Sequence, residues 1–145
     1  MMQKALDFLR YHNEVAFATS DGHLPKIRIF QIMKQDGNIL YLSTSTEKVV
    51  WKELIKNPNV EVLAYADNIS VRCSGMVNFD VEDNVKRWIY DHNPVLPRLY
   101  SSYDQLVYFR LPAHCRDGLF RPYAYTPYLQ AFRPDGRRYW RRIFR

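Results

Sequence analysis

Residues 41–58 constrain the fold of this chain most strongly, because a short apolar strand there runs directly into a helix. The strand ends in consecutive serine and threonine residues, and Lys48 follows near the start of an amphipathic pattern over 47–57. We expect Thr46 to cap that helix and Pro58 to end it. A helix start exposes unpaired N–H groups and the positive end of the helix dipole. Hydroxyl groups and a lysine at that place predict a site for a phosphate or another anion.

Six short runs of alternating or continuous apolar residues indicate antiparallel strands. Asp36 and Gly37, between the second and third runs, are typical of a tight hairpin. Gly75, inside the fifth run, indicates a bulge or a close backbone approach. With short helices over 2–12, 47–57 and 82–92, the pattern predicts a mainly β fold, a small antiparallel β-barrel with helical decoration. The predicted strands are 15–19, 26–33, 39–43, 60–65, 69–79 and 106–111.

The composition is that of a soluble globular protein, with 47% hydrophobic and 25% charged residues. No apolar run approaches the roughly 18–20 residues of a membrane span, and the N-terminus lacks a signal pattern, so we expect a cytoplasmic protein without membrane contact. Residues 1–109 hold 12 Lys and Arg against 13 Asp and Glu, whereas residues 110–145 hold nine Arg against two Asp. The near-neutral body therefore gives no argument for nucleic-acid binding.

The two cysteines, Cys73 and Cys115, form neither a metal-ligand spacing nor a disulfide framework. We expect Cys73 to be a small buried strand residue without a redox role. The four histidines are scattered along the chain, so a zinc site is not expected.

The order of these pieces resembles the pyridoxamine 5′-phosphate oxidase-like family, the flavin-binding split barrels, from about residue 3 to residue 111. Each motif is short, and the resemblance depends on their order and spacing. The main motifs are Ala-Thr-Ser-Asp-Gly at 18–22, Pro-Lys-Ile-Arg-Ile-Phe at 25–30, Leu-Tyr-Leu-Ser-Thr-Ser-Thr-Glu-Lys at 40–48, Lys-Asn-Pro-Asn-Val at 56–60 and Val-Arg-Cys-Ser-Gly at 71–75. The resemblance implies a six-stranded antiparallel split β-barrel with Greek-key topology over 1–111, which binds FMN at a homodimer interface. Residues 112–145 would be an extension.

The resemblance also implies roles for three groups of residues. The first lies along the flavin, the second holds the phosphate with hydroxyls and a lysine, and the third comes from the second chain of the dimer. A phosphate suits these residue types, because arginine offers a forked donor and lysine a point charge. A cation near the flavin ring also stabilises its anionic reduced form. In order, the groups are Arg28, Ile29 and Phe30; Thr44, Ser45 and Lys48; and Arg72 and Ser74.

Each group also has a purely structural interpretation. Arg28 can be a cross-strand ion-pair partner, and Thr44 and Ser45 can simply end a strand and cap a helix. Lys52 and Lys56 continue the spacing of the first lysine on one helix face, where a solvated basic stripe is the simpler interpretation.

The chain departs from the true oxidase of vitamin B6 metabolism, which has a lysine shortly after its flavin arginine. Five residues after Arg28 this chain has Met33, and Lys34 lies one position further. A small flavin reductase or oxidase-like relative fits better, with hydride or electron transfer between a reduced nicotinamide or other donor and a small acceptor. No side chain is an obvious general base, which agrees with chemistry carried by the cofactor. A split barrel that binds haem or a deazaflavin is a rival hypothesis, although no histidine is well placed as an axial ligand.

The extension over residues 112–145 interleaves arginine with aromatic residues and contains no lysine or glutamate. Three explanations remain open. The extension wraps over the partner subunit, it binds nucleic acid or another anionic surface as a non-enzymatic module, or it comes from a shifted reading frame. We do not expect a nucleic-acid partner for the chain as a whole, because only this extension carries excess positive charge.

Overall fold

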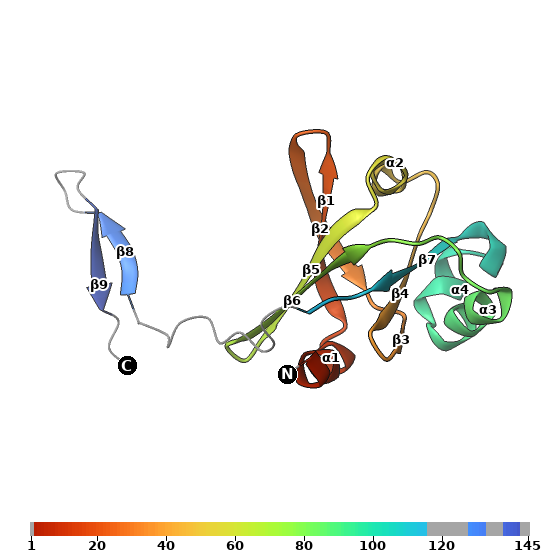
Figure 1. Ribbon diagram of the computed structural model, residues 1–145, viewed down its shortest axis with the longest axis horizontal. Coiled ribbons are helices and arrows are strands. Elements are labelled where there is room, and N and C mark those ends of the chain that lie inside the picture. The colour runs from red at the N-terminus through yellow and green to blue at the C-terminus, as the bar shows by residue number, and fades with distance from the viewer. Residues whose placement is uncertain (1, 116–127, 133–137, 143–145) are drawn as a thin grey trace.

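The computed structural model describes residues 2–115, 128–132 and 138–142, with side chains over the first range only. Figure 1 shows a strand-rich body with short helices around it. The elements in chain order are α1 (Met2–Tyr11), β1 (Glu14–Asp21), β2 (Leu24–Gln31), β3 (Lys34–Asp36), β4 (Ile39–Thr44), α2 (Val49–Lys56), β5 (Asn59–Ala66), β6 (Ile69–Met76), α3 (Asp83–His92), α4 (Val95–Leu99), the 3₁₀ helix η1 (Tyr103–Gln105), β7 (Val107–Pro112), β8 (Tyr128–Phe132) and β9 (Arg138–Arg142).

The predicted mainly β fold with short helices is confirmed, but the strands form two sheets rather than one six-stranded barrel. One sheet has the order β2-β1-β5-β6 and the other the order β3-β4-β7, and every pairing in them is antiparallel. β8 pairs with β9 in a separate two-stranded sheet. The body therefore has seven strands, because β2 ends at Gln31, before the end of the predicted second strand, and β3 forms at 34–36, where no strand was predicted.

β2 ends and β3 begins where the backbone changes its hydrogen-bonding partner. The Ile32 N–H donates to the Asn13 carbonyl at 2.8 Å, which extends the pairing of β2 with β1. The next residue, Met33, donates to the Tyr41 carbonyl at 2.8 Å, which begins the pairing of β3 with β4. The chain thus passes from one sheet to the other at Ile32 and Met33. The predicted hairpin follows, and Gly37 has the positive φ of 56° that its tight turn requires.

The second junction between the sheets lies between β6 and the chain that leaves β7. Isolated antiparallel bridges join Ser74 to His114 and Asn78 to Arg110, and both belong to one register. Gly75 lies in this register, and a Cβ atom there would stand 2.6 Å from the Pro112 carbonyl oxygen. The predicted close backbone approach at Gly75 is therefore confirmed, and it explains why β6 ends soon afterwards.

The prediction that the two cysteines form no disulfide was wrong. Cys73 and Cys115 are bonded, with an S–S distance of 2.07 Å, and they occupy the pair next to Ser74 and His114 in the same register. Cysteines 42 positions apart give no signal of pairing in the sequence. The bond depends on β7 returning along β6, which only the fold reveals. The expectation that Cys73 is buried is confirmed, since it is 1% exposed.

Two apolar clusters hold the body together. The larger one packs α1 and α2 against the strands and includes Leu9, Phe17, Leu54 and Phe109. The smaller one packs α3 and α4 against the β3-β4-β7 sheet and includes Ile89. α1 and α2 lie toward opposite ends of the strands (Figure 1). No helix within the described ranges is long and apolar enough to span a membrane.

Candidate cofactor-binding site

The junction between β4 and α2 offers donors for an anion. β4 ends at Thr44 and α2 begins at Val49, after a turn in which the Ser45 hydroxyl accepts the Glu47 N–H at 3.2 Å. Lys48 is the N-cap residue of α2, and its exposed side chain makes no capping hydrogen bond. Although the Trp51 N–H in the first turn of α2 donates to the Lys48 carbonyl at 3.1 Å, no side chain caps this turn, which begins next to a lysine. This is the combination that phosphate groups bind in proteins.

The expected cap at Thr46 was wrong. Thr46 is exposed and lies two positions before the N-cap residue of α2. The turn is closed instead by Ser45, whose carbonyl accepts the Lys48 N–H at 3.1 Å. Because Ser45 uses both its hydroxyl and its carbonyl within the turn, the helix starts later than the sequence pattern indicates.

Thr44 places an unsatisfied hydroxyl at the same junction. Its side chain is only 2% exposed, yet Oγ1 has no hydrogen-bond partner among the described residues. A buried polar group without a partner costs about 1–3 kcal/mol. Thr44 therefore retains the capacity to donate to and accept from a bound group. Ser45 beside it is also buried.

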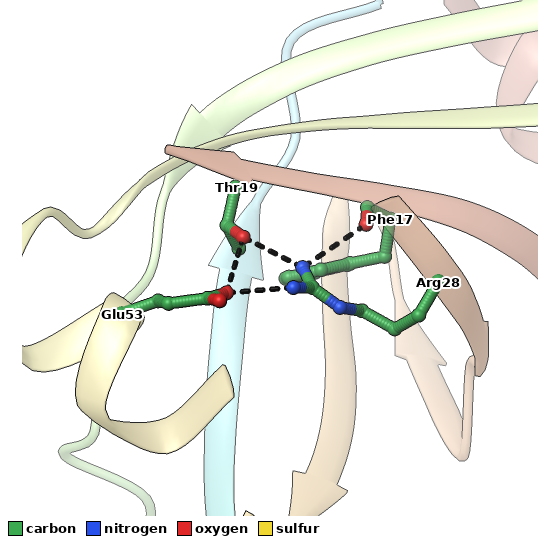
Figure 2. A network of polar contacts seen from close by, with 4 residues as sticks. All are labelled: Phe17, Thr19, Arg28 and Glu53. Atoms are coloured by element: carbon green, nitrogen blue, oxygen red, sulfur yellow. Dashed lines mark hydrogen bonds and ion pairs between the residues drawn. The ribbon is translucent and has the colours of Figure 1, made fainter. Parts of the chain in front are cut away.

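Arg28 points toward α2 and joins a compact polar network (Figure 2). Its Nη2 donates to Glu53 Oε2 at 2.6 Å, and its Nη1 donates to Thr19 Oγ1 at 2.6 Å and to the Phe17 carbonyl at 3.4 Å. The Thr19 hydroxyl donates to the same Glu53 oxygen at 2.6 Å. The Glu53 side chain is 4% exposed and that of Arg28 27% exposed. Arg28 is thus an ion-pair partner, but of a helix residue rather than a residue on a neighbouring strand.

This network fixes α2 against β1 and β2. Glu53 lies five residues after Lys48, a rise of about 8 Å along the helix axis. Holding Glu53 therefore also holds the start of α2. Sequence analysis missed Glu53 and Thr19, although a signal existed. Glu53 lies beside Leu54 and three residues after Val50 on the buried side of the helix, and a buried carboxylate requires a cation.

The other predicted residues divide between the two faces of the larger sheet. Phe30 packs inward, with its ring centroid 4.6 Å from that of Phe17. Ile29 points outward and is 69% exposed. Arg72 is also exposed and pairs with Glu61 at 3.0 Å across the neighbouring strand. Ser74 is half-buried, and its backbone forms the bridge to His114 described above.

Ile29 and Arg72 belong to one row across the outer face of this sheet. The register runs from Ile29 to Ala16, then to Leu63 and Arg72. Three strand spacings separate the ends of this row, or about 14 Å. Within one chain, therefore, Arg72 and Ser74 on β6 lie far from the β2 edge.

Metal binding has no support in the described part of the chain. Within residues 2–115, no three His, Cys, Asp or Glu side chains come together in a way that could hold a metal ion. The donors at the junction between β4 and α2 are suited to binding and orienting an anionic group.

Known structures share this fold. A NimC/NimA family protein from Clostridium acetobutylicum is 28% identical, with a TM-score of 0.66 over 76% of this chain and 81% of that one. An FAD-binding protein from Mesorhizobium loti is 16% identical, with a TM-score of 0.62 over 79% and 90%. An F420 reductase is 14% identical, with a TM-score of 0.58 over 71% and 87%. The last two likenesses concern the fold alone.

The sequence itself gives a complementary result. No curated protein matches the chain. The family model for pyridoxamine 5′-phosphate oxidase, however, matches residues 1–94, which include β1 to β6, the junction between β4 and α2, and all of α3. The resemblance predicted from the motifs is thereby confirmed, and the chain belongs to the pyridoxamine 5′-phosphate oxidase family.

Proposed function

We propose that this protein is an FMN-dependent oxidoreductase that acts as a homodimer. The observation that carries the proposal is the junction between β4 and α2. There, side-chain-uncapped helix N–H groups, the exposed Lys48 and the unpartnered Thr44 hydroxyl occur together. A flavin phosphate, with nearly two negative charges and three acceptor oxygens, matches this set of donors.

The outer face of the β2-β1-β5-β6 sheet supports the homodimer. Small residues, Ala16 and Ala18, occupy its centre on β1, and large exposed apolar side chains flank them. Large exposed apolar side chains on one sheet face, here beside the Arg72–Glu61 ion pair, often mark a protein–protein contact. A second copy of the chain would cover this face and bring its own Arg72 and Ser74 toward the β2 edge. The flanking residues and their exposed fractions are Ile27 70%, Ile29 69%, Leu63 41% and Tyr65 62%.

In this proposal the protein binds and orients the cofactor, and the flavin supplies the hydride or electron transfer. Lys48 and the start of α2 hold the phosphate, with Thr44 and Ser45 as further hydroxyl partners. Ile29 offers an apolar edge for the ring. Arg28 acts mainly through Glu53 as a positioning residue for α2, because both of its terminal nitrogens are already engaged. The electron donor would be a reduced nicotinamide or a similar small molecule, and the acceptor a small molecule.

A related cofactor is the second candidate. The fold is shared with an FAD-binding protein and an F420 reductase, and all three cofactors carry a phosphate beside a flat ring system. The anion site alone does not separate them. We favour FMN, because the donors found at the junction between β4 and α2 suit one terminal phosphate. We also retain residues 1–111 as the cofactor-binding domain, 112–145 as an extension of separate role, and a cytoplasmic location. Most of that extension lies outside the described residues.

Substitution of Lys48 tests the phosphate site directly. Loss of a charge-assisted hydrogen bond costs about 1.5–3 kcal/mol, so Lys48→Ala should weaken FMN binding roughly 10- to 150-fold. Lys52→Ala is the matched control, since this exposed lysine lies one turn further along the same helix. Fluorescence titration with FMN, FAD and F420 would measure both the effect and the cofactor preference. Equal FMN affinity in the two variants would remove Lys48 from the site.

A further inference from the structure

We propose that Cys73 and Cys115 form a reversible thiol-oxidation site, which fastens the chain after β7 to strand β6. The chain contains two cysteines in total, and the structure joins them. In cytosolic proteins, disulfides are usually transient and redox-sensing, because the thiol pools keep structural cysteines reduced. With the cytoplasmic location proposed above, on which this step rests, the single disulfide is a bond whose state can follow the redox poise.

The geometry of the junction shows what the bond holds. Beside it, the Ser74 N–H donates to the His114 carbonyl at 3.0 Å, and the His114 N–H donates to the Ser74 carbonyl at 2.8 Å. Cys73 and Cys115 are the next directly opposed pair, with their Cα atoms 4.0 Å apart. In an antiparallel ladder, such a non-hydrogen-bonded pair brings side chains together on one face. Here that face is the core, where both residues are buried.

Besides the disulfide, residues 113–115 are held by the two bonds between Ser74 and His114, by bonds to Asn38, and by the burial of Ala113 and Cys115 in the larger apolar cluster. Ala113 is tied to Asn38, by N–H to carbonyl at 2.8 Å and by the Asn38 amide to the Ala113 carbonyl at 3.3 Å. By contrast, β6 pairs with β5 over its whole length, Ile69 to Met76. Segments with few backbone bonds open locally at low free energy. Local opening here would expose the two sulfurs to a reductant without unfolding the sheets.

A dithiol reductant can open the Cys73–Cys115 disulfide by thiol–disulfide exchange. A thiolate of the reductant attacks one sulfur, the Cys73–Cys115 bond breaks, and a mixed disulfide forms. The second thiol of the reductant then resolves the mixed disulfide. Two electrons and two protons pass to the protein, which gains two thiols, and the reductant leaves as a disulfide.

Strand β6 gives this switch a consequence for the proposed cofactor site. Cys73 lies between Arg72 and Ser74, the two residues predicted to reach the flavin from the second chain. Releasing residues 113–115 removes the neighbour that orders one edge of β6 at this point. We therefore expect reduction to weaken FMN binding, and this last consequence rests on the proposed function.

The experiment compares the full chain after mild oxidation and after treatment with dithiothreitol. Alkylation and mass spectrometry should count no free thiols in the oxidised protein and two in the reduced one. Hydrogen exchange should show faster exchange at the Ser74 and His114 amides after reduction, with the β5 amides unchanged. The melting temperature should fall by about 10 °C, as expected for opening a loop of this length. Re-oxidation should restore all three.

Because the chain has no other cysteine, Cys115→Ser supplies a clean control that should match the reduced protein and ignore the reductant. Two free thiols after oxidation would overturn the proposal. Unchanged exchange and melting temperature on reduction of the wild-type protein would also overturn it, and this result does not depend on the variant folding. Failure of both redox forms to bind FMN would count against the proposed function alone, because the thiol count and the exchange do not involve the cofactor.

Discussion

The two faces of the β2-β1-β5-β6 sheet both carry large apolar side chains, but those of the inner face are buried and those of the outer face are exposed beside the Arg72–Glu61 ion pair. The inner face carries Val15, Phe17, Val62 and Val71, all nearly inaccessible to solvent. The outer face carries large apolar side chains that remain exposed, with Ile29 at its β2 edge. A strand that is apolar on both faces normally lies between two layers. The inner face thus stabilises the fold of the single chain, and the exposed apolar side chains of the outer face agree with the proposal that a second copy covers it.

The largest effect should come from truncating the same kind of side chain on each face. Phe17→Ala removes a fully buried ring that contacts Phe30 and Phe109, and we expect a loss of about 3–5 kcal/mol in the free energy of unfolding. Ile29→Ala removes an exposed side chain and should change the stability of the monomer by less than about 0.5 kcal/mol. Urea denaturation at low protein concentration would measure both. A large loss in Ile29→Ala under those conditions would show that the outer face also belongs to the monomer core.

A second test concerns the polar network at the end of the inner face. Arg28→Ala leaves the Glu53 carboxylate buried without its cation, and breaking such a pair costs roughly 3 kcal/mol. Arg28→Ala combined with Glu53→Leu should recover much of that loss, because an apolar pair replaces the unpaired charge. Thermal denaturation of the single and double variants would give the coupling between the two residues. Equal stability in the Arg28 single variant and the wild-type protein would contradict a structural role for the ion pair.

The sequence predicts the strands well where one local pattern decides them. The Asp36-Gly37 hairpin and the close approach at Gly75 follow from glycine's freedom at positive φ and from its missing Cβ. The change from β2 to β3 could not be predicted, because it depends on Ile32 and Met33 finding different partners elsewhere in the chain.

The candidate site was only partly predictable for the same reason. Thr44 and Lys48 are only four positions apart in the sequence, so the junction between β4 and α2 is visible in the pattern. The partners of Arg28 are nine and 25 positions away, and the disulfide joins residues 42 positions apart. Long-range pairs of this kind depend on register between strands, which alternation alone does not determine.

The smallest expected effect lies on α3, away from both faces of the sheet. A hydrogen bond from Tyr103 lowers the pKa of Asp83, with help from Arg87. Because the folded pKa lies below the unfolded value, the carboxylate stabilises the fold above its unfolded pKa. This contribution is lost as the pH falls through the folded value. Asp83→Asn should therefore be slightly less stable than the wild-type protein at pH 7, and equally stable at a pH below the folded pKa. A difference that persists at low pH would contradict this linkage.

The most direct test of the account is gel filtration of the purified protein with its visible absorption recorded across the elution, before and after adding FMN. We predict flavin absorption that elutes with the protein at twice the chain mass of 17.4 kDa. We also predict that a variant with Ile27→Asp and Ile29→Asp loses both the dimer and the flavin. A wild-type protein that elutes as a colourless monomer and takes up no FMN would contradict the proposal that the outer face forms the subunit interface and the cofactor site.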